Sequence, residues 1–447
     1  MTAFRTALVL AVWLLACRTQ SARGYTPEFG KEMCAELQNS YQELRDNLES
    51  YAFSTVRYVD PLMGVDNESC LWSSDGRAPC KTINYALEQE NATTAASVHN
   101  ISVSLLPGEH HLPFRLIVRN SSFVRIRGVE PHLTRITCTK FPNEDLPCSF
   151  DQVDLRSSSM LFISNITFTR CGPIPVALFM EDVNHLIIED CVFEGNLGTP
   201  ILALDFDNMY LVRNTFSGNR LARLNSNVTQ FPCTRITREL FFYSDVRTAG
   251  GISVSVSRIP MNLFVWQSMF LNNSAHPNLD GDTLPERLRP LGRGGAISVR
   301  LVNASNSHMC IKDSKFLGNI AEIAAGAISF TAANFTNHSS LTLWNVLLED
   351  NRCEIGTCVG GGLHFQTDGQ EIEREVNVIS VYDSVFKRNA AGIGAAFIGF
   401  TDALQSFYYI HNTTFEANMG RHEGGVLAVL NFFDFTMLRT RLWLEDW

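Results

Sequence analysis

Two carboxylates spaced two residues apart are the feature of the sequence that most suggests chemistry. Asp205 and Asp207 lie in the stretch LALDFDNMYL, where apolar and polar residues alternate as in a β-strand. Residues i and i+2 of a strand point to the same side, so the two carboxylates are expected on one face. A pair of carboxylates is the usual acid and base, or acid and nucleophile, of glycoside hydrolysis. Asp205 and Asp207 are therefore the candidate catalytic residues.

A structural role for the same pair is the alternative, and the sequence favours it. An outward-facing Asp205 and Asp207 would solvate the surface of a sheet, and no third carboxylate or arginine is expected in register on a neighbouring strand. We therefore expect a non-catalytic protein and keep catalysis as the alternative.

Other residues that could bind a metal, a nucleotide or a substrate do not form a recognisable site. Asp280 and Asp282 in NLDGDT suggest a calcium loop but do not have the EF-hand spacing. His110 and His111 are adjacent, so on a strand they point to opposite faces and make a poor chelate. The sequence has no nucleophile elbow and no phosphate-binding glycine loop after a strand. No metal and no cofactor is expected.

The composition indicates a folded, acidic protein. Of 447 residues, 45% are hydrophobic and 18% are charged, which is enough apolar material for a large core. The chain has 46 acidic and 36 basic residues, a net charge of −10, and no Lys/Arg run interleaved with aromatic residues. Nucleic acid is therefore not expected as a partner.

The first 24 residues are typical of a secretory signal peptide. Arg5 precedes an apolar run that ends at Cys17, and small residues follow at the spacing of a cleavage site. A lipoprotein signal that ends at a lipidated Cys17 is the alternative. No later apolar stretch reaches the ~20 residues that a spanning helix needs, so no membrane span is expected in this chain.

Glycosylation acceptors favour a eukaryotic secretory route. The Asn-x-Ser/Thr pattern occurs more often than chance would give for this composition. We therefore expect an extracellular glycoprotein, secreted or at the cell surface, with its cysteines in an oxidising compartment. The expected glycosylation sites are Asn67, Asn91, Asn100, Asn120, Asn165, Asn227, Asn272, Asn303, Asn334, Asn337 and Asn412.

Close cysteine pairs predict disulfides that each pinch off a short loop. The chain has 12 cysteines, one of them Cys17 in the signal, so an odd number remains and one thiol is free or paired with another chain. The disulfide candidates are Cys70 with Cys80, Cys138 with Cys148, and Cys353 with Cys358.

A four-residue phrase, Phe-x-x-Asn, recurs along the chain and indicates a structural repeat. Turn-forming residues precede most copies by three positions, so the unit is longer than the phrase itself. A glycine phrase such as GGAISV or AGAISF follows each later copy, and uninterrupted copies are about 23 to 30 residues apart, as in a solenoid. The copies begin at Phe193, Phe216, Phe270, Phe316, Phe386 and Phe415, with variants at Leu348 and Phe168.

This repeat predicts an all-β fold, a right-handed parallel β-helix solenoid with an N-terminal capping helix. Alternating polarity predicts strands, and no amphipathic helix separates them, which excludes βαβ units. In a parallel β-helix, equivalent positions of successive coils stack about 4.8 Å apart. Phe is therefore expected on Phe inside the tube, and Asn on Asn in a hydrogen-bonded ladder at one bend.

Two resemblances agree with this fold. Over about residues 160 to 430, the alternating Phe-x-x-Asn and Gly-Gly-Ala-Ile phrases resemble the repeats of bacterial polymorphic outer membrane proteins, surface adhesins with a β-helix passenger. The front of the chain resembles pectate-lyase-like β-helix proteins, with a strand at Tyr58 and Val59 and a capping helix between Pro79 and Leu87. The second resemblance implies a polysaccharide lyase or hydrolase, but the polygalacturonase-like phrases Asn-Thr-Asp, Gly-His-Gly and Arg-Ile-Lys are absent.

The chain is expected to be one solenoid with short additions at its ends. Apolar residues between Cys34 and Tyr51 repeat at intervals of three and four, which predicts an amphipathic helix that packs on the solenoid or, alternatively, forms a coiled coil. The last coil has no polar cap, as in a fragment of a longer protein. The predicted segments are a signal peptide at 1–24, an amphipathic helical segment at 25–54, an N-terminal strand and capping helix at 55–100, a parallel β-helix at 101–435 and a truncated tail at 436–447.

Two long insertions, at 220–249 and 274–293, fall between a Phe-x-x-Asn phrase and the following glycine phrase. They are expected to leave the solenoid at one corner and to form a composite recognition surface there, or else to be tolerated insertions without a partner. We therefore predict a secreted or cell-surface glycoprotein that displays loops for adhesion to an extracellular protein or glycan. A carbohydrate-active enzyme and a structural ectodomain fragment of a longer membrane receptor are the alternatives.

Overall fold

The fold is taken from a computed structural model. It describes residues 28–88, 100–112, 116–137, 151–171, 176–221, 249–275, 292–333, 338–354, 358–368, 376–401, 405–421, 426–430, 434–438 and 441–443.

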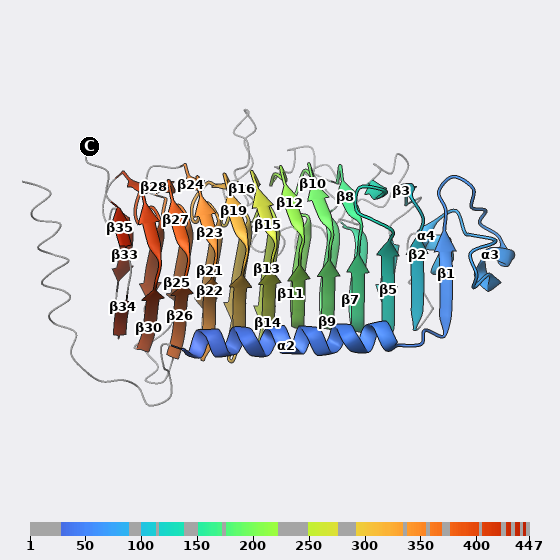
Figure 1. Cartoon of the computed structure of the whole chain (residues 1–447), viewed down its shortest axis with the longest axis horizontal. Helices are drawn as coiled ribbons and strands as arrows, with labels where there is room; N and C mark the ends of the chain where they lie inside the picture. The colour runs from blue at the N-terminus through green and yellow to red at the C-terminus, as the bar shows by residue number, and fades with distance from the viewer. Residues whose placement is uncertain are drawn as a thin grey trace, which may run out of the picture.

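The described chain winds as a parallel β-helix (Figure 1). Its strands form three sheets, of 19, 11 and 5 strands, and the paired strands run parallel. The first sheet is two strand rows joined at a bend, because β7, β9 and β11 continue through it. Strands of the first row are β4 (Leu116–Arg119), β7 (Asp151–Ser164), β9 (Val176–Glu189), β11 (Ile201–Val212), β13 (Ile252–Ser257), β17 (Ile297–Val302), β21 (Ile328–Ala333), β25 (Leu363–Asp368), β29 (Phe397–Thr401) and β33 (Leu427–Leu430).

The second row carries the strands that face the long helix. Besides the later halves of β7, β9 and β11, its strands are β1 (Thr55–Val59), β2 (Ile101–Leu105), β5 (Phe123–Gly128), β14 (Asn262–Trp266), β18 (His308–Lys312), β22 (Ser339–Trp344), β26 (Val376–Tyr382), β30 (Gln405–His411) and β34 (Asp434–Leu438).

The second sheet contains the Phe-x-x-Asn phrases, and the third is a narrow strip beside it. The second sheet consists of β3 (Gly108–His111), β6 (Thr134–Thr137), β8 (Thr167–Thr169), β10 (Val192–Glu194), β12 (Thr215–Ser217), β15 (Met269–Leu271), β19 (Lys315–Leu317), β23 (Leu347–Glu349), β27 (Val385–Lys387), β31 (Thr414–Glu416) and β35 (Arg441–Trp443). The third consists of β16 (Ser274–Ala275), β20 (Ile320–Ala321), β24 (Arg352–Cys353), β28 (Ala390–Ala391) and β32 (Met419–Gly420).

The phenylalanines of the repeat stack inside the tube, as predicted. From Phe168 through Phe193, Phe216 and Phe270 to Phe316, successive ring centroids lie 4.6 to 5.0 Å apart and the rings are nearly parallel. Each of these side chains is at most 2% exposed. Since burying a Phe side chain contributes about 1.5 to 3 kcal/mol, the stack is a large part of the core's stability.

The asparagines of the repeat form the predicted ladder. Asn319 Nδ2 donates to Asn351 Oδ1 at 2.9 Å and to the carbonyl of Phe270 at 3.0 Å, while its Oδ1 accepts from the backbone and side-chain nitrogens of Asn273 at 3.0 Å. The same pattern joins each neighbouring pair from Asn196 to Asn418. The ladder therefore supplies hydrogen-bond partners to amide groups that are buried and have no access to water.

The sharp bends are made by residues in the left-handed region. The residue before each ladder asparagine has a positive φ, for example 65° at Gly318 and 56° at Asp350. The turn-forming residues three positions before the phenylalanines do the same, for example 50° at Asp313 and 55° at Asn345. Asn, Asp and Gly adopt this conformation at low cost, which explains why the sequence repeats them there.

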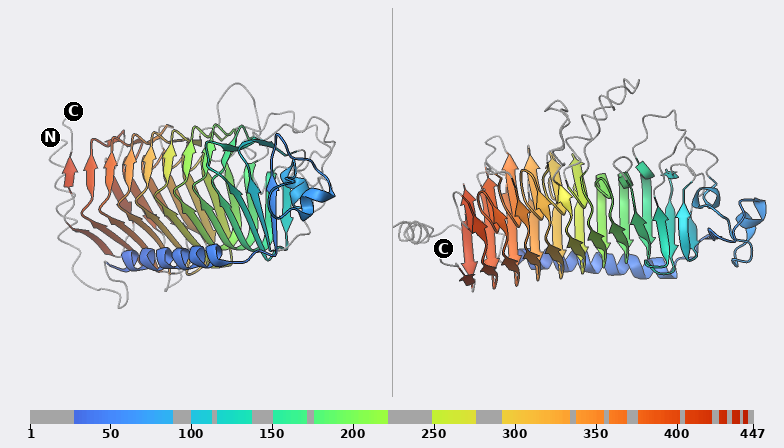
Figure 2. Two further views of the ribbon diagram at one scale, coloured as in Figure 1. Left: turned by 45° about the vertical axis from the view of Figure 1, so that its right-hand side comes forward. Right: turned by 90° about the horizontal axis from the view of Figure 1, so that it is seen from above.

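A long helix, α2 (Phe29–Ser50), lies lengthwise along the β-helix (Figures 1 and 2). It falls within the segment predicted to be helical, and it packs on the second strand row, against β14, β18, β22 and β26. Its inward side chains include Cys34, Leu37, Tyr41 and Leu48, the positions whose three- and four-residue spacing predicted an amphipathic face. A disulfide between Cys34 and Cys310 fixes the helix to β18.

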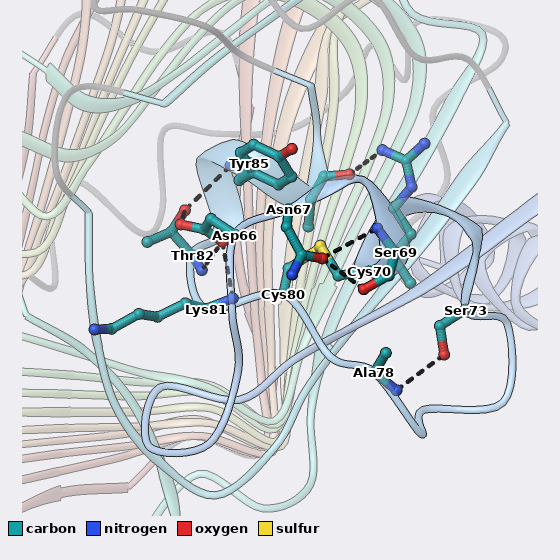
Figure 3. The surroundings of a disulfide bond; sticks show 12 residues. Asp66, Asn67, Ser69, Cys70, Ser73, Ala78, Cys80, Lys81, Thr82 and Tyr85 are labelled. Carbon is teal, nitrogen blue, oxygen red and sulfur yellow. Dashed lines mark hydrogen bonds between the residues drawn. A yellow bond between two sulfur atoms is a disulfide. The ribbon is translucent and has the colours of Figure 1, made fainter.

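Short elements cover the N-terminal end of the solenoid. Helices α3 (Glu68–Trp72) and α4 (Ile83–Ala86) lie beside β1, and the side chains of Asn67 and Thr82 accept hydrogen bonds from the first turns of these helices. Asp66 accepts from the backbone nitrogens of Lys81 and Thr82 at 2.8 and 3.0 Å (Figure 3). These elements shield part of the edge of β1. Among the described residues, no helix combines the length and apolarity needed to cross a bilayer.

Candidate functional site

Asp205 and Asp207 lie at the bend between the two strand rows. Asp205 has a φ of 42°, so β11 turns there and the simple alternation of faces is interrupted. Asp205 is half-buried and Asp207 is exposed. The expectation that the pair shares one flat strand face therefore does not hold, because the left-handed residue changes the direction of the strand between them.

A third carboxylate lies next to Asp205, contrary to expectation. Asp182 is opposite Asp205 on the preceding coil, since the residues on either side of them pair in parallel register. Ser157 Oγ donates to Asp182 Oδ2 at 3.2 Å, and the Ser257 backbone N–H donates to Asp205 Oδ1 at 2.6 Å. Burial and then the negative charge of Asp182 raise the pKa of Asp205, while the Ser257 hydrogen bond opposes the shift. The sequence did not reveal this pair, because no repeated phrase marks that bend.

A groove runs between α2 and the second strand row close to this bend. Its volume is ≈ 310 Å³, at the lower end of the range of small-molecule sites. One wall comes from α2 and the other from β9 and β11. The lining residues are Ser40, Glu43, Leu44, Asn47, His185, Asn208 and Tyr210.

The strand wall of the groove is a row of hydrogen-bonded polar side chains. Asn208 Nδ2 lies 3.3 Å from His185 Nδ1, and Asn208 Oδ1 accepts from Asn262 Nδ2 at 3.0 Å. Burial lowers the pKa of His185, and the nearby Asp207 carboxylate opposes that shift. Above that lowered pKa the imidazole is neutral, with Nδ1 as the acceptor and the proton on Nε2. The amides and the imidazole are thus fixed before any ligand arrives.

The same row continues along the helix. His308 follows Asn262 in register, and His308 Nδ1 lies 2.9 Å from Ser340 Oγ on the next coil. Burial lowers the pKa of His308 to about 4. Polar side chains therefore follow the edge of α2 from coil to coil.

A buried ionic cluster holds the C-terminal half of α2 beside the groove. Glu189, whose side chain is 3% exposed, pairs with Arg45 from the helix at 3.1 Å and with Arg213 from the bend after β11. Arg213 also binds Asp190 through two nitrogens, at 2.8 and 2.9 Å. Burial and then the Glu189 carboxylate raise the pKa of Tyr41. Two guanidinium groups neutralise the buried carboxylate, so these charges hold the helix in place and are not free for a ligand.

The N-terminal half of α2 is held by the cation–π contacts of its Lys31 and by a hydrogen bond from Lys312 of β18. Lys312 Nζ lies 4.2 Å from the centroid of the Trp344 ring and donates to Gln38 Oε1 at 2.7 Å. Lys31 lies 4.8 Å from the centroid of the Tyr382 ring. The helix is therefore anchored at both ends and, through Cys34, in between.

The ends of the two predicted insertions meet at one corner of the solenoid. Arg220 and Ser274 form a parallel bridge, and the Leu221 backbone N–H donates to the Ser274 carbonyl at 2.7 Å. The insertions thus leave equivalent positions of adjacent coils. Residues 222–248 and 276–291 themselves lie outside the described residues. The predicted features that fall there are Asn227, Asp280 and Asp282.

The cysteines combine predicted and unpredicted pairings. A disulfide joins Cys70 and Cys80, and the disulfide between Cys34 and Cys310 spans 276 residues, so no local spacing could reveal it. Cys171 is disulfide-bonded as well. Cys353 and Cys358 are buried thiols in contact with each other. The remaining candidates, Cys138 and Cys148, lie outside the described residues.

The Cys353 and Cys358 thiols influence each other's ionisation. Burial, followed by the hydrogen bond to Cys358, raises the pKa of the Cys353 thiol. The same hydrogen bond lowers the pKa of Cys358. The Cys353 thiol also donates to the Glu322 carbonyl at 3.7 Å, so it has a backbone acceptor besides its contact with Cys358.

The described glycosylation acceptors lie on accessible turns. Each is exposed or half-exposed, and all but Asn67 have a positive φ, from 49° to 59°. A left-handed turn presents the side chain away from the strand, which suits an attached glycan. The described acceptors are Asn67, Asn100, Asn120, Asn165, Asn272, Asn303 and Asn412. Outside the described residues lie Asn91, Asn227, Asn334 and Asn337.

The two adjacent histidines point apart, as expected for a strand. His110 is buried, with Nε2 at 2.8 Å from the Leu106 carbonyl, and His111 is exposed near Glu109. Within the part of the chain that the structure describes, no three His, Cys, Asp or Glu side chains are grouped as metal ligands.

A match to a protein-family model supports the fold. Residues 116–282 match a family model described as a right-handed β-helix region. The native GH136 lacto-N-biosidase from Eubacterium ramulus is similar in structure, with a TM-score of 0.43 and 11% sequence identity, over 92% of this chain and 70% of that chain.

The selenomethionine derivative of the same enzyme gives a TM-score of 0.27 and 10% identity, over 91% of this chain and 71% of that chain. A search of curated protein sequences finds no match. The family match and the parallel pairing together identify a right-handed parallel β-helix, as the sequence predicted.

Proposed function

We propose that the protein is a secreted or cell-surface glycoprotein that recognises an extracellular protein or glycan without transforming it. In this proposal the solenoid is a rigid support, and recognition surfaces project from its corners and from the edge of α2. The first surface is the corner from which the two insertions leave, next to β12 and β16. Adhesion is also what the resemblance to polymorphic outer membrane proteins implies.

The observation that carries the proposal is the bridge between Arg220 and Ser274. It places the first residues of two insertions side by side on adjacent coils, so both insertions leave the solenoid at the same edge. Loops on a rigid scaffold are the usual place for binding residues. The stacked Phe and Asn rows supply the rigidity, since each coil is fixed by the coils on both sides.

The covalent features support an extracellular location. Disulfides such as Cys34–Cys310 and Cys70–Cys80 persist in oxidising compartments. The described Asn-x-Ser/Thr acceptors are accessible, as glycosylation requires. We expect the mature protein to carry glycans on these turns.

The test is a binding screen of the secreted protein on arrays of extracellular proteins and glycans. A variant in which glycine-serine linkers replace residues 222–248 and 276–291 keeps every described strand. We expect this variant to lose at least one ligand that the intact protein binds, while its circular dichroism and its Cys34–Cys310 disulfide are unchanged. The proposal is overturned if the linker variant binds every ligand that the intact protein binds, or if neither protein binds any ligand.

A carbohydrate-active enzyme is the second candidate, and one observation favours it. Asp182 and Asp205 lie on adjacent coils, and the pKa of Asp205 is raised, as expected for a carboxyl group that donates a proton. Cleavage would release reducing ends from a glycan, and Asp205→Asn would slow it by about a hundredfold or more. Unchanged release by Asp205→Asn would remove Asp205 from any mechanism.

A further inference from the structure

We infer that the groove between α2 and the strand row is a binding site for an uncharged or amino-bearing sugar, and that acidic sugars are excluded. The inference rests on the proposed function, because it names the ligand class of a recognition protein. It concerns a different surface from the insertion corner, so the two can fail separately.

The size of the groove fits a small part of a ligand. Its volume of ≈ 310 Å³ is near the lower limit of small-molecule sites, so it accommodates one or two rings of a longer chain. Its floor includes Tyr210, which is 2% exposed, and its rim includes exposed polar residues of α2 such as Ser40, Glu43 and Asn47. Such a shape receives the end or an exposed segment of an oligosaccharide.

The lining offers donors and acceptors in the mixture that hydroxyl groups require. Neutral His185 presents an Nε2–H donor, because its Nδ1 faces Asn208. Asn47 and Ser40 each offer a donor and an acceptor, and Glu43 offers two acceptor oxygens. Sugar hydroxyls both donate and accept, so they can satisfy all of these groups.

The polar wall is pre-organised. Asn208 is held between His185 and Asn262 by hydrogen bonds at 3.3 and 3.0 Å. Because these side chains are already ordered, binding does not have to supply the free energy to order them. The opposite wall is equally fixed, since Arg45 and Cys34 anchor the helix to the strands.

The charge of the groove selects against acidic ligands. Glu43 lines it, and Asp207 lies close enough to influence His185. None of the described lining residues is Lys or Arg, and the nearby Arg45 already pairs with Glu189 and Glu49. A uronate, sialate or sulfate would therefore meet like charge without a cationic partner, whereas an ammonium group would be attracted.

A peptide fits the groove less well than a sugar. The strands that border it, β9 and β11, are paired on both sides, so a peptide cannot add as a further strand. Helical and aromatic peptide anchors need a deep apolar pocket, and among the lining residues only Leu44 and Tyr210 are apolar in part. The polar walls favour a polyhydroxylated ligand.

The experiment uses the full-length secreted protein on a glycan array divided into neutral, amino-bearing and acidic members. The strongest ligand is then titrated in solution. Ser40→Trp places a large side chain in the groove from an exposed position of α2, and Glu43→Gln removes its charge. Glu36→Gln changes an exposed carboxylate of the same helix outside the groove and is the matched control.

We expect binding to neutral or amino-bearing glycans, weakened about tenfold or more by Ser40→Trp and unchanged by Glu36→Gln. Glu43→Gln should weaken amino-bearing ligands more than neutral ones. The inference is overturned if the ligands are acidic, or if Ser40→Trp binds as well as the parent protein. Protein ligands alone would overturn it while leaving the proposed function intact, and no ligand of any kind would overturn both.

Discussion

At the scale of single residues, the ladder asparagines do the most to define the fold. Asn319 is fully buried, and its side chain serves the coil before it and the coil after it. An amide is suited to this position because it donates and accepts at once. This is why the phrase Phe-x-x-Asn returns with the same last residue.

Removing one amide from the ladder should be costly. Asn319→Ala removes the acceptor of the Asn273 backbone N–H and of one Asn273 side-chain N–H, and it removes the side-chain donor to the Phe270 carbonyl, all in a dry interior. We expect a loss of about 3 kcal/mol in the free energy of unfolding, measured by urea denaturation. Lys315→Ala, an exposed change in the adjacent strand, should stay within about 0.5 kcal/mol. Equal effects of the two variants would contradict the ladder's role.

Buried histidines should make stability depend on pH. Burial, and then the charge of Arg293, lower the pKa of His364 to about 3, from an ordinary value near 6.5. Between pH 3 and pH 6.5 the unfolded chain therefore binds a proton at His364 that the folded chain does not bind. The stability that His364 contributes is complete above pH 6.5 and is lost as the pH falls toward 3, by at most about 1.4 kcal/mol per pH unit.

His364→Asn should therefore flatten the fall in unfolding midpoint between pH 7 and pH 4.5. His132→Asn, at a side chain that is 72% exposed, is the control and should leave the slope unchanged. The same slope in the His364 variant and the parent protein would refute the assignment.

The Cys353 and Cys358 thiols should close to a disulfide in the secreted protein. The two thiols are buried in contact with each other, and a small-molecule disulfide such as oxidised glutathione would accept the two electrons and two protons that they release on joining. Peptide mass mapping without reduction should show the two linked. Cys191, whose pKa burial raises to about 12, should remain a thiol that resists alkylation until the protein unfolds. Two separately alkylated cysteines would show that the pair stays reduced.

At the scale of elements, the solenoid coils were more predictable than what packs on them. The strands and bends repeat, so equivalent residues of successive copies were expected to stack. The neighbours of Phe316 and Asn319 could therefore be predicted from the positions of the other copies. The amphipathic pattern of α2 predicted a helix, but its position depends on side chains far away in the sequence, such as Cys310, Trp344 and Glu189. Contacts of that kind leave no local signal.

The candidate site was the least predictable part, for a related reason. Asp205 was found because it lies in a strand-like stretch, but Asp182 becomes its neighbour only once the coil length is known. His185 and Asn208 likewise form one polar row only when the coils are in register. The period-two argument also failed at Asp205, because a left-handed residue bends β11 there.

The close approach of α2 to the strands gives a test of its docking. A Cβ on Gly30 would lie 2.7 Å from Ser380 Cβ and 2.8 Å from Thr342 Oγ1, which is too close for any side chain. Gly30→Leu should therefore displace the start of the helix and speed trypsin cleavage after Lys31. Glu32→Leu, at an exposed position of the same helix, should not. Equal cleavage rates for the two variants would mean that the helix is not docked as described.

At the scale of the whole molecule, the interior residues that make the β-helix rigid are distinct from the surface residues that would contact a ligand. The interior rows fix the coils, so the bends, the insertion corner and the α2 groove can differ without affecting the core. Acceptor asparagines lie on both sides of the helix-covered row, at Asn120 and Asn303 on one side and at Asn165 and Asn412 on the other. Attached glycans would then flank the helix-covered row and restrict which ligands approach it.

Recognition without catalysis is the central claim, and the fate of a bound ligand tests it most directly. The glycan that binds most tightly is incubated with the secreted protein and with its Asp205→Asn variant, and the recovered glycan is examined by mass spectrometry. We predict that both proteins return the ligand at its original mass after binding it reversibly. Fragments produced by the parent protein and not by the Asp205→Asn variant would contradict the account and identify an enzyme.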